Sequence, residues 1–328
     1  MAVRTAGKEK PVLNGKGERK MSDYLERFLE AHRAYYKTAL EEISWGRKKS
    51  HWMWFIFPQI RGLGYSETAQ YYAIHDIDEA QEYLMDPVLR KNTLEIAAAL
   101  LRVQSNDAEK VMGWPDNLKL RSSMTLFSEA EPECGIFQRV LDKFFQGKKD
   151  PATLQILEAQ KKLQEKFEFR SIRLEEAMQA AEMERICFPP NEACSEKMML
   201  ERVAKAPEYF LVAADRESGK LAGYINGLAT EETSFRDEFF TDTDIHDPEG
   251  RTIMILGLEV LPEYRGQGLA RELMRQYLAD QRENGKKLVL LTCLQEKVEM
   301  YKKMGFHDDG MADSSWGGEE WHEMSVKL

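Results

Sequence analysis

The sequence predicts two domains, an all-α N-terminal domain followed by an α+β domain built on a central mixed sheet. A chain of 328 residues is long enough for two domains of ordinary size. Helical periodicity dominates the first half, with almost no alternating strand pattern. From Phe169 onward, short runs of strand type alternate with helical segments. The change of pattern near the middle of the chain therefore predicts two different folds, one after the other.

Composition narrows the class of protein. Hydrophobic residues make up 43% and charged residues 31%, as in an ordinary globular protein. No apolar run reaches membrane-spanning length and no signal peptide is recognisable, so we expect a cytoplasmic protein without a membrane partner. The net charge of −10 argues against nucleic-acid binding and is compatible with a cationic substrate such as an amine. The four cysteines lack metal-ligand spacing, so we expect reduced thiols and no metal.

The N-terminal half is expected to contain a tail and a helical domain. Residues 1–21 are rich in Lys, Arg and Gly, which predicts a disordered tail. Met21 is an alternative native start, because the codons before it are purine-rich like a bacterial ribosome-binding site. Residues 22–157 are predicted to be helical, with Ser22 as the first cap and Asp150-Pro151 starting the last helix. The polar stretch 158–168 is expected to link the domains, and helical patterns cover 22–45, 67–72, 77–85, 89–102 and 135–146.

The C-terminal domain, residues 169–328, is organised around the stretch 252–270. This stretch opens as an apolar strand, is stopped by Pro262, and turns through Arg265–Ala270 into a helix. Such a turn exposes unpaired N–H groups at the positive end of a helix dipole, which suits a phosphate or pyrophosphate. Glycines allow the ligand to approach the backbone more closely than a Cβ would permit. Further strands are predicted at 169–173, 209–214, 221–227, 287–293 and 320–327.

The segment V-L-P-E-Y-R-G-Q-G-L-A resembles the acetyl-CoA signature of the GNAT superfamily of N-acetyltransferases, Arg/Gln-x-x-Gly-x-Gly/Ala. Arg265, Gly268 and Ala270 occupy its defined positions, and M-Y-K-K-M-G-F follows further on. Within the superfamily, C-F-P-P-N-E-A-C-S, A-G-Y-I-N-G and W-H-E-M-S make the chain most similar to the arylalkylamine (serotonin-type) enzymes. The resemblance implies acetyl-CoA as co-substrate and a primary amine, arylalkylamine- or polyamine-like, as acceptor.

The first half resembles a bacterial family of helical domains of unknown function. The resemblance rests on S-H-W-M-W-F-I-F-P-Q-I-x-G-L-G, Y-A-I and K-L-R-S-S-M-T-L-F. It implies a helical fold and no particular chemistry.

The GNAT resemblance implies cofactor contacts from the central strand and the turn after it. The strand is expected to splay from its neighbour, so that free backbone groups run alongside the pantetheine. An N–H at Leu258 or Val260 would then face the thioester oxygen, as in an oxyanion hole. The predicted cofactor-binding residues are Leu258, Glu259, Val260, Arg265, Gly266, Gln267, Gly268, Leu269 and Ala270.

Tyr301 is the predicted catalytic acid, since it occupies the tyrosine position of the family's Y-x-x-x-G-F. A phenol there could protonate the departing thiolate, although the same residue could be a core aromatic on an amphipathic helix. The sequence departs from the family at Leu294, where many members place a cofactor-contacting asparagine.

The general base stays open. Met254 and Leu256 stand where the serotonin-type enzymes carry histidines, and neither side chain can take a proton. Ordered water, Glu259, His322 or a carboxylate of the acidic insertion 230–250 could serve instead. The predicted substrate contacts are Phe188, Pro189, Asn226 and Phe239.

Two other functions compete with amine acetylation. The missing histidines would suit a non-catalytic, acyl-CoA-responsive binding protein. The helical half could also handle a nucleotide or ADP-ribose-like ligand, making the chain bifunctional, although its aromatic segment is more typical of a core. The polar residues that could line such a pocket are His51, Gln59, Asp116, Lys119, Ser122 and Ser123. The oligomeric state is not predicted.

Overall fold

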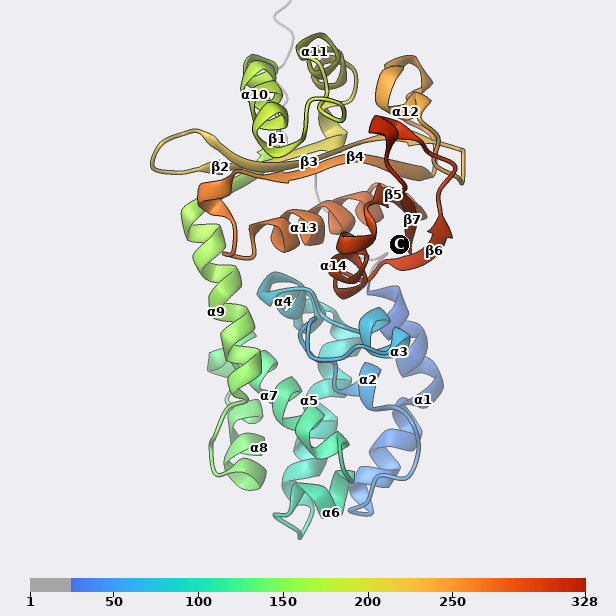
Figure 1. The fold of residues 1–328 in the computed structure, drawn as a ribbon. Coiled ribbons are helices and arrows are strands. Elements are labelled where there is room, and N and C mark those ends of the chain that lie inside the picture. The colour runs from blue at the N-terminus through green and yellow to red at the C-terminus, as the bar shows by residue number, and fades with distance from the viewer. Residues whose placement is uncertain (1–24) are drawn as a thin grey trace, which may run out of the picture.

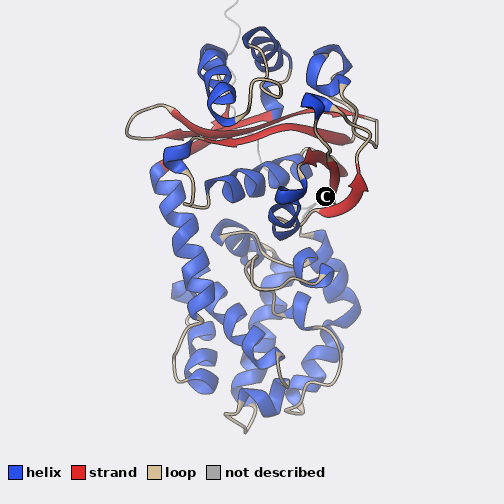
Figure 2. Ribbon diagram, viewed as in Figure 1, coloured by secondary structure: helices blue, strands red, loops and turns tan. Residues whose placement is uncertain are grey.

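The computed structural model describes residues 25–328, so the tail, the alternative start at Met21 and the Ser22 cap lie outside the described residues. A helical domain occupies the lower part of Figure 1 and a sheet domain the upper part. Figure 2 shows that the strands gather in the upper domain. The predicted architecture, a helical region followed by an α+β domain with a mixed sheet, is confirmed. Within 25–328, none of the helices combines the length and apolar character needed to cross a bilayer.

The helical domain packs around the aromatic segment of residues 50–60. Trp52, Phe55 and Phe57 are buried in a single apolar cluster, as the core interpretation predicted. Three of the helices were not predicted as separate elements: the short helices α2 and α6 and the long helix α7. The helices are α1 (Glu26–Ser44), α2 (Met53–Ile56), α3 (Glu67–Tyr71), α4 (Ile77–Met85), α5 (Pro87–Arg102), α6 (Ala108–Met112), α7 (Asp116–Ala130), α8 (Ile136–Phe145) and α9 (Pro151–Lys166).

Helix α9 joins the two domains. Its first turn is capped as the sequence predicted, because the Asp150 carboxylate accepts a hydrogen bond of 2.9 Å from the Thr153 backbone N–H. The helix continues to Lys166, and strand β1 (Phe167–Ser171) starts at the next residue. The stretch 158–168, expected as the connector, is therefore regular helix followed by strand.

The second domain contains a seven-stranded sheet in the order β1-β2-β3-β4-β5-β7-β6. Strands β4 and β5 run parallel and every other neighbouring pair is antiparallel, which makes the sheet mixed. The edge strand β6 was not predicted. After β1, the strands are β2 (Phe210–Asp215), β3 (Leu221–Thr230), β4 (Thr252–Val260), β5 (Leu288–Cys293), β6 (His307–Met311) and β7 (His322–Lys327).

Helices cover both faces of this sheet. Figure 1 shows α10, α11 and α12 on the outer face, and α13 and α14 between the sheet and the helical domain. Buried strands such as β3, whose ten residues are all buried, require apolar layers on both sides. These helices are α10 (Ala177–Cys187), α11 (Glu196–Lys205), α12 (Glu238–Thr241), α13 (Leu269–Glu283) and α14 (Val298–Lys303).

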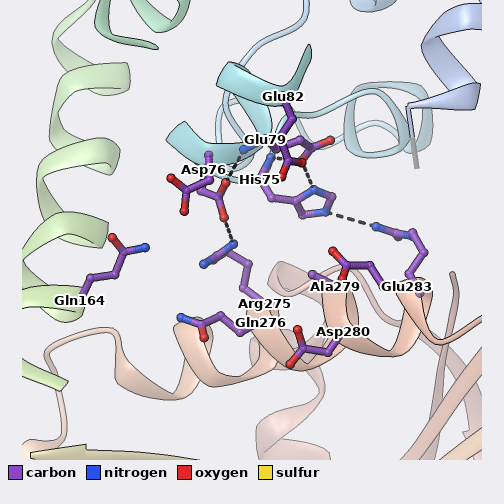
Figure 3. A pocket seen from close by; sticks show the side chains of 12 residues that line it. His75, Asp76, Glu79, Glu82, Gln164, Arg275, Gln276, Ala279, Asp280 and Glu283 are labelled. Carbon is purple, nitrogen blue, oxygen red and sulfur yellow. Dashed lines mark hydrogen bonds and ion pairs between the residues drawn. The ribbon is translucent and has the colours of Figure 1, made fainter. Parts of the chain in front are cut away.

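Polar contacts join α13 to the helical domain. Arg275 of α13 lies 2.5 Å from the Asp76 carboxylate at the start of α4 and 2.6 Å from Glu272 on its own helix. Figure 3 shows the two helices facing one another across these side chains. Nearby, His75 Nδ1 contacts Glu79 at 2.5 Å, and its Nε2 lies 3.5 Å from Arg282. The interface between α13 and the helical domain therefore consists largely of charged side chains that pair with one another.

Candidate functional site

The central strand separates from its parallel neighbour part-way along its length. Strands β4 and β5 pair only from Thr252 to Met254, although β4 continues to Val260. Beyond that point the β5-facing edge of β4 has no partner strand within residues 25–328. Leu256 and Leu258 are half-exposed along this edge, whereas most of β4 is buried. The structure thus leaves backbone groups along this edge of β4 without a strand partner and available to an extended ligand.

The turn after β4 leads into the start of α13 and is open to solvent. Gly266 and Gly268 have φ values of +75° and +86°, which few other residues adopt easily, and a Cβ on either would meet no atom within 4 Å. Within residues 25–328, no group accepts a hydrogen bond from the backbone N–H of Gly266, Gln267 or Gly268. The three donors lie at the positive end of a fifteen-residue helix, which fits a pyrophosphate.

The side chain of Arg265 turns back toward the strand. Its Nε donates to the Val260 carbonyl oxygen at 2.9 Å, and Nη2 lies 3.6 Å from the Cys187 sulfur. The first residue of the signature thus fixes the turn against the end of β4 and leaves the glycine amides exposed. Lys166, at the end of α9, also supports the turn by donating to the Gln267 side-chain oxygen at 2.9 Å.

Three side-chain oxygens converge on the position beside Gly257 of β4 that a Cβ would occupy, and this position is called the space above Gly257. A Cβ placed on this glycine would lie 2.9 Å from a carboxyl oxygen of Glu259, 3.1 Å from the amide oxygen of Asn226 and 3.9 Å from a carboxyl oxygen of Glu184. Glu259 and Asn226 are each 2% exposed. Within residues 25–328, none of their side-chain polar atoms has a hydrogen-bond partner. The site therefore presents polar groups that a ligand could pair with: carboxyl and amide oxygens as acceptors and the Asn226 amide nitrogen as a donor.

Burial and the nearby Glu184 carboxylate raise the pKa of Glu259 well above its usual value. Glu184 itself is held by neighbours: it accepts from the Tyr224 hydroxyl at 3.1 Å and from the Cys194 backbone N–H at 3.1 Å, and lies 3.9 Å from Arg202. Glu259 is thus the acid of the pair that favours the protonated form. Such a carboxyl group can take a proton from a ligand once its own proton has passed to solvent.

Glu184, Tyr224 and Arg202 were not predicted. A signal for Glu184 was present, because Ala177, Ala180, Ala181 and Glu184 follow the i, i+3, i+4, i+7 spacing of one helix face. Because the apolar face of this helix packs against the sheet, a carboxylate on the same face is buried with it. The sequence around Tyr224 and Arg202 gives no comparable signal. Their contacts with Glu184 arise only from the packing of β3 and α11 against α10.

The other predicted catalytic residues occupy different surroundings. Tyr301 lies on α14, is almost fully buried and packs against Phe306 with ring centroids 5.8 Å apart. Burial raises its pKa, so the phenol stays protonated. His322 of β7 contacts Asp308 at 3.1 Å, and Arg236 binds Glu232 of the acidic insertion at 2.7 Å. Among the proposed bases, Glu259 alone shares the space above Gly257.

The predicted substrate contacts divide into two groups. Asn226 lies in the acceptor site, and Phe188 and Pro189 follow the end of α10, close to the end of β4. Phe239 is buried in an apolar cluster with Met254 of β4, away from the three oxygens around Gly257. The reason for this burial is packing, because the insertion needs an apolar anchor. Its neighbour Phe240 instead stacks on Trp316 at 5.0 Å, joining the insertion to the C-terminal loop.

The polar residues singled out in the helical half are only partly brought together. Gln59, Lys119 and Ser122 line a cavity of about 360 Å³ beside Trp54. Ser123 is buried in the helical core. His51 and Asp116 do not line this cavity. Asp116 forms ion pairs with Lys48 and Lys119 at 2.7 and 2.9 Å. Within residues 25–328, no group of three His, Cys, Asp or Glu side chains could hold a metal ion.

The strand separation, the glycine turn and the open helix start together suit an extended ligand that carries a pyrophosphate. Residues 176–306 match the acetyltransferase (GNAT) family, and residues 22–157 match the family described as protein of unknown function (DUF1810). Each half of the chain therefore matches one family model, and the match in the second half supports an acyltransferase domain with acetyl-CoA as co-substrate.

Solved structures resemble each half separately. The conserved hypothetical protein Rv1873 from Mycobacterium tuberculosis is 42% identical, with a TM-score of 0.40, covering 41% of this chain and 96% of its own. The GNAT-like decarboxylase GphF, solved with isobutyryl-CoA, is 17% identical, with a TM-score of 0.42, covering 49% and 98%. The protein yncA from Salmonella typhimurium, solved with its cofactor acetyl-CoA, is 16% identical, with a TM-score of 0.37, covering 49% and 94%. None of the curated proteins searched matches the sequence.

Proposed function

We propose that this protein is an acetyl-CoA-dependent N-acetyltransferase that acetylates a primary amine by direct attack in a ternary complex. The proposal is carried by the three oxygens of Glu259, Asn226 and Glu184 around the space above Gly257. A primary ammonium group has three N–H donors and a positive charge, which matches three acceptors that include a carboxylate. The class of amine, arylalkylamine- or polyamine-like, follows from the sequence resemblance.

Glu259 would act as the base. An alkylammonium has a pKa of about 10 and must lose a proton before its nitrogen can attack. When the cation enters, its charge favours ionisation of the buried Glu259 carboxyl, whose own proton passes to solvent. The resulting carboxylate then accepts a proton from the ammonium group. Asn226 would orient the nitrogen, and Glu184, held by Tyr224, would strengthen the negative field of the site.

The turn and the unpaired edge of β4 would hold the acyl donor. The N–H groups of Gly266, Gln267 and Gly268, with the start of α13 at Leu269 and Ala270, would bind the pyrophosphate. The backbone of Leu258 and Val260 would flank the pantetheine, and one N–H there would donate to the thioester oxygen. Acetyl-CoA supplies the activated acyl group, and Tyr301 would supply a proton to the sulfur. Phe188 and Pro189 would form part of the acceptor's entrance.

A thiol-release assay tests this function. The intact chain should release CoA from acetyl-CoA when a primary amine is added, and a panel of arylalkylamines and polyamines would identify the preferred class. Gly257→Ala should abolish transfer while acetyl-CoA binding persists, because the new methyl group fills the acceptor space. Acetyl-CoA binding without turnover on any amine would contradict the proposal and support the acyl-CoA-responsive binding protein instead.

A further inference from the structure

A cavity of about 340 Å³ lies between the two domains, next to the glycine turn. Gln267, Gly268 and one side of α13 form part of its wall, together with residues 303–305 at the end of α14. The opposite wall comes from residues 61–65 of the helical domain and from α9. Its volume falls within the range of small-molecule sites, which begins at about 300 Å³. A ligand held by the turn can therefore extend into a space that the helical domain closes.

The cavity is positively charged, although the whole chain carries a net charge of −10. Its walls include Arg61, Arg271, Arg275 and Lys303 and a single carboxylate, Glu272. Arg275 is already paired with Glu272 at 2.6 Å. Within residues 25–328, no carboxylate lies at ion-pair distance from the other three cations. An excess of unpaired cations in an acidic protein indicates a site for an anion.

Arg61 comes from the helical domain and reaches into the acetyltransferase domain. Its Nη2 donates to the Met304 carbonyl oxygen at 3.1 Å. Gly305 makes room for it, because a Cβ there would lie 2.6 Å from the same nitrogen. Burial and the neighbouring Arg282 lower the pKa of Arg61 to about 10. A partly buried guanidinium without a carboxylate partner is costly, and an anionic ligand would offset that cost.

Tyr65 is the second contribution of the helical domain. It lines the cavity and is 79% exposed, and no aromatic ring of residues 25–328 stacks on it. An exposed aromatic ring beside a cationic pocket suits a nucleotide base, since stacking of a base on an aromatic side chain is favourable for any base.

We propose that the helical domain completes the acyl-CoA site, with the 3′-phosphate and adenine of CoA in the interdomain cavity. Arg61, Arg271 and Lys303 surround the phosphate, and Tyr65 stacks on the adenine. This inference rests on the proposed function, because it requires the pyrophosphate at the Gly266–Gly268 turn. The proposal gives the helical domain a role in binding acetyl-CoA. The domain would contact the adenosine 3′-phosphate end of the molecule, away from the reacting acyl group.

Calorimetric titration of the intact chain tests the proposal with CoA, 3′-dephospho-CoA and pantetheine as probes. Arg61→Ala should weaken CoA binding about tenfold, the effect of one charge-assisted hydrogen bond, and leave pantetheine binding unchanged. The same variant should barely affect 3′-dephospho-CoA. Tyr65→Ala should weaken both nucleotide-bearing ligands, and it carries little risk to folding because the side chain is exposed. Arg33→Ala is the matched control, since Arg33 is exposed on α1 and forms an exposed ion pair with Glu26.

The outcomes separate the two proposals. Unchanged CoA affinity in both Arg61→Ala and Tyr65→Ala overturns the interdomain site while the acyltransferase function stands. Failure of the unaltered chain to bind CoA at all overturns both. Adenosine 3′,5′-bisphosphate provides a further check: it should compete with CoA, and simultaneous binding of the two would show that the cavity serves a separate nucleotide.

Discussion

Glu259 combines two properties that a purely structural carboxyl would not need. It is buried, and its oxygens have no hydrogen-bond partner within residues 25–328. Burying an unpartnered polar group destabilises a fold, so sites of this kind commonly serve a ligand. The neighbouring Asn226 amide is in the same condition, and Gly257 keeps the space between them open. The buried, unpartnered side chains of Glu259 and Asn226 therefore lower the stability of the fold, as expected for residues that serve a ligand.

Glu259→Gln should make the protein more stable at neutral and alkaline pH. The folded-state pKa of Glu259 is raised above its unfolded value of about 4.3. Below that value the carboxyl group is protonated in both states, and its contribution to stability is complete. As pH rises toward the folded pKa, the unfolded chain loses this proton first, so the stability of the folded protein falls. Glutamine does not titrate. In urea unfolding, the free-energy difference between variant and parent should grow with pH in this window, by at most about 1.4 kcal/mol per pH unit. A difference that does not change with pH would contradict the raised pKa.

Tyr301→Phe should lower the rate of acetyl transfer and leave acetyl-CoA affinity unchanged. The phenyl ring keeps the contact with Phe306, and only the acidic hydroxyl is removed. General acids of this kind contribute about 10²- to 10⁴-fold. Steady-state kinetics with a saturating amine give the comparison, and an unaltered rate would assign Tyr301 to packing alone.

At the scale of elements, strand β4, the turn after it and α13 form one functional unit. The turn needs positive φ at Gly266 and Gly268, and the helix start needs its donors free. Both requirements are local, which is why the sequence was sufficient to predict them.

Gly268→Ala should destabilise the fold by about 1 kcal/mol and also weaken acetyl-CoA binding, since an alanine at φ +86° is strained and its methyl group enters the ligand space. Gly219→Ala is the matched control, because Gly219 has φ +70° and open surroundings in the turn between β2 and β3. Thermal unfolding should show similar losses for both variants. Isothermal titration should show weaker binding for Gly268→Ala only; an equal loss of affinity in both would remove the turn from the cofactor site.

Elements with local signals were predicted well, and those that depend on partners were not. Helix α4 was predicted with its observed limits, from its apolar spacing. Strand β6, H-D-D-G-M, is an exposed polar edge whose structure comes from pairing with β7, so its own sequence carries no strand pattern. The acceptor site was predicted in part for the same reason. Asn226 and Glu259 lie on strands that were predicted, whereas Glu184 reaches them only through the packing of α10 on the sheet.

At the scale of the whole molecule, the two domains form a charged interface along α13. Asp76 caps α4 through one carboxyl oxygen and contacts Arg275 through the other. The same helix begins at the glycine turn, so the interface and the proposed cofactor site share one rigid element.

Asp76→Asn should weaken this interface and lower the free energy of unfolding by about 2 kcal/mol, because asparagine preserves the helix cap and removes only the charge facing Arg275. Glu165→Gln is the control, since its contact with Lys161 is exposed on α9 and should matter by less than about 0.5 kcal/mol. Urea denaturation measures both. Equal effects in the two variants would show that the Asp76–Arg275 pair adds nothing beyond a surface pair.

The most direct test of the central claim is the pH dependence of kcat/KM for acetyl transfer to the preferred amine. If Glu259 accepts the proton of the bound ammonium, Glu259→Gln should lower kcat/KM by about 10²- to 10⁴-fold and remove the rise in rate that the parent shows as Glu259 ionises. Glu201→Gln on α11, outside the site, should retain the parent profile. An unchanged rate and an unchanged profile in Glu259→Gln would contradict the account.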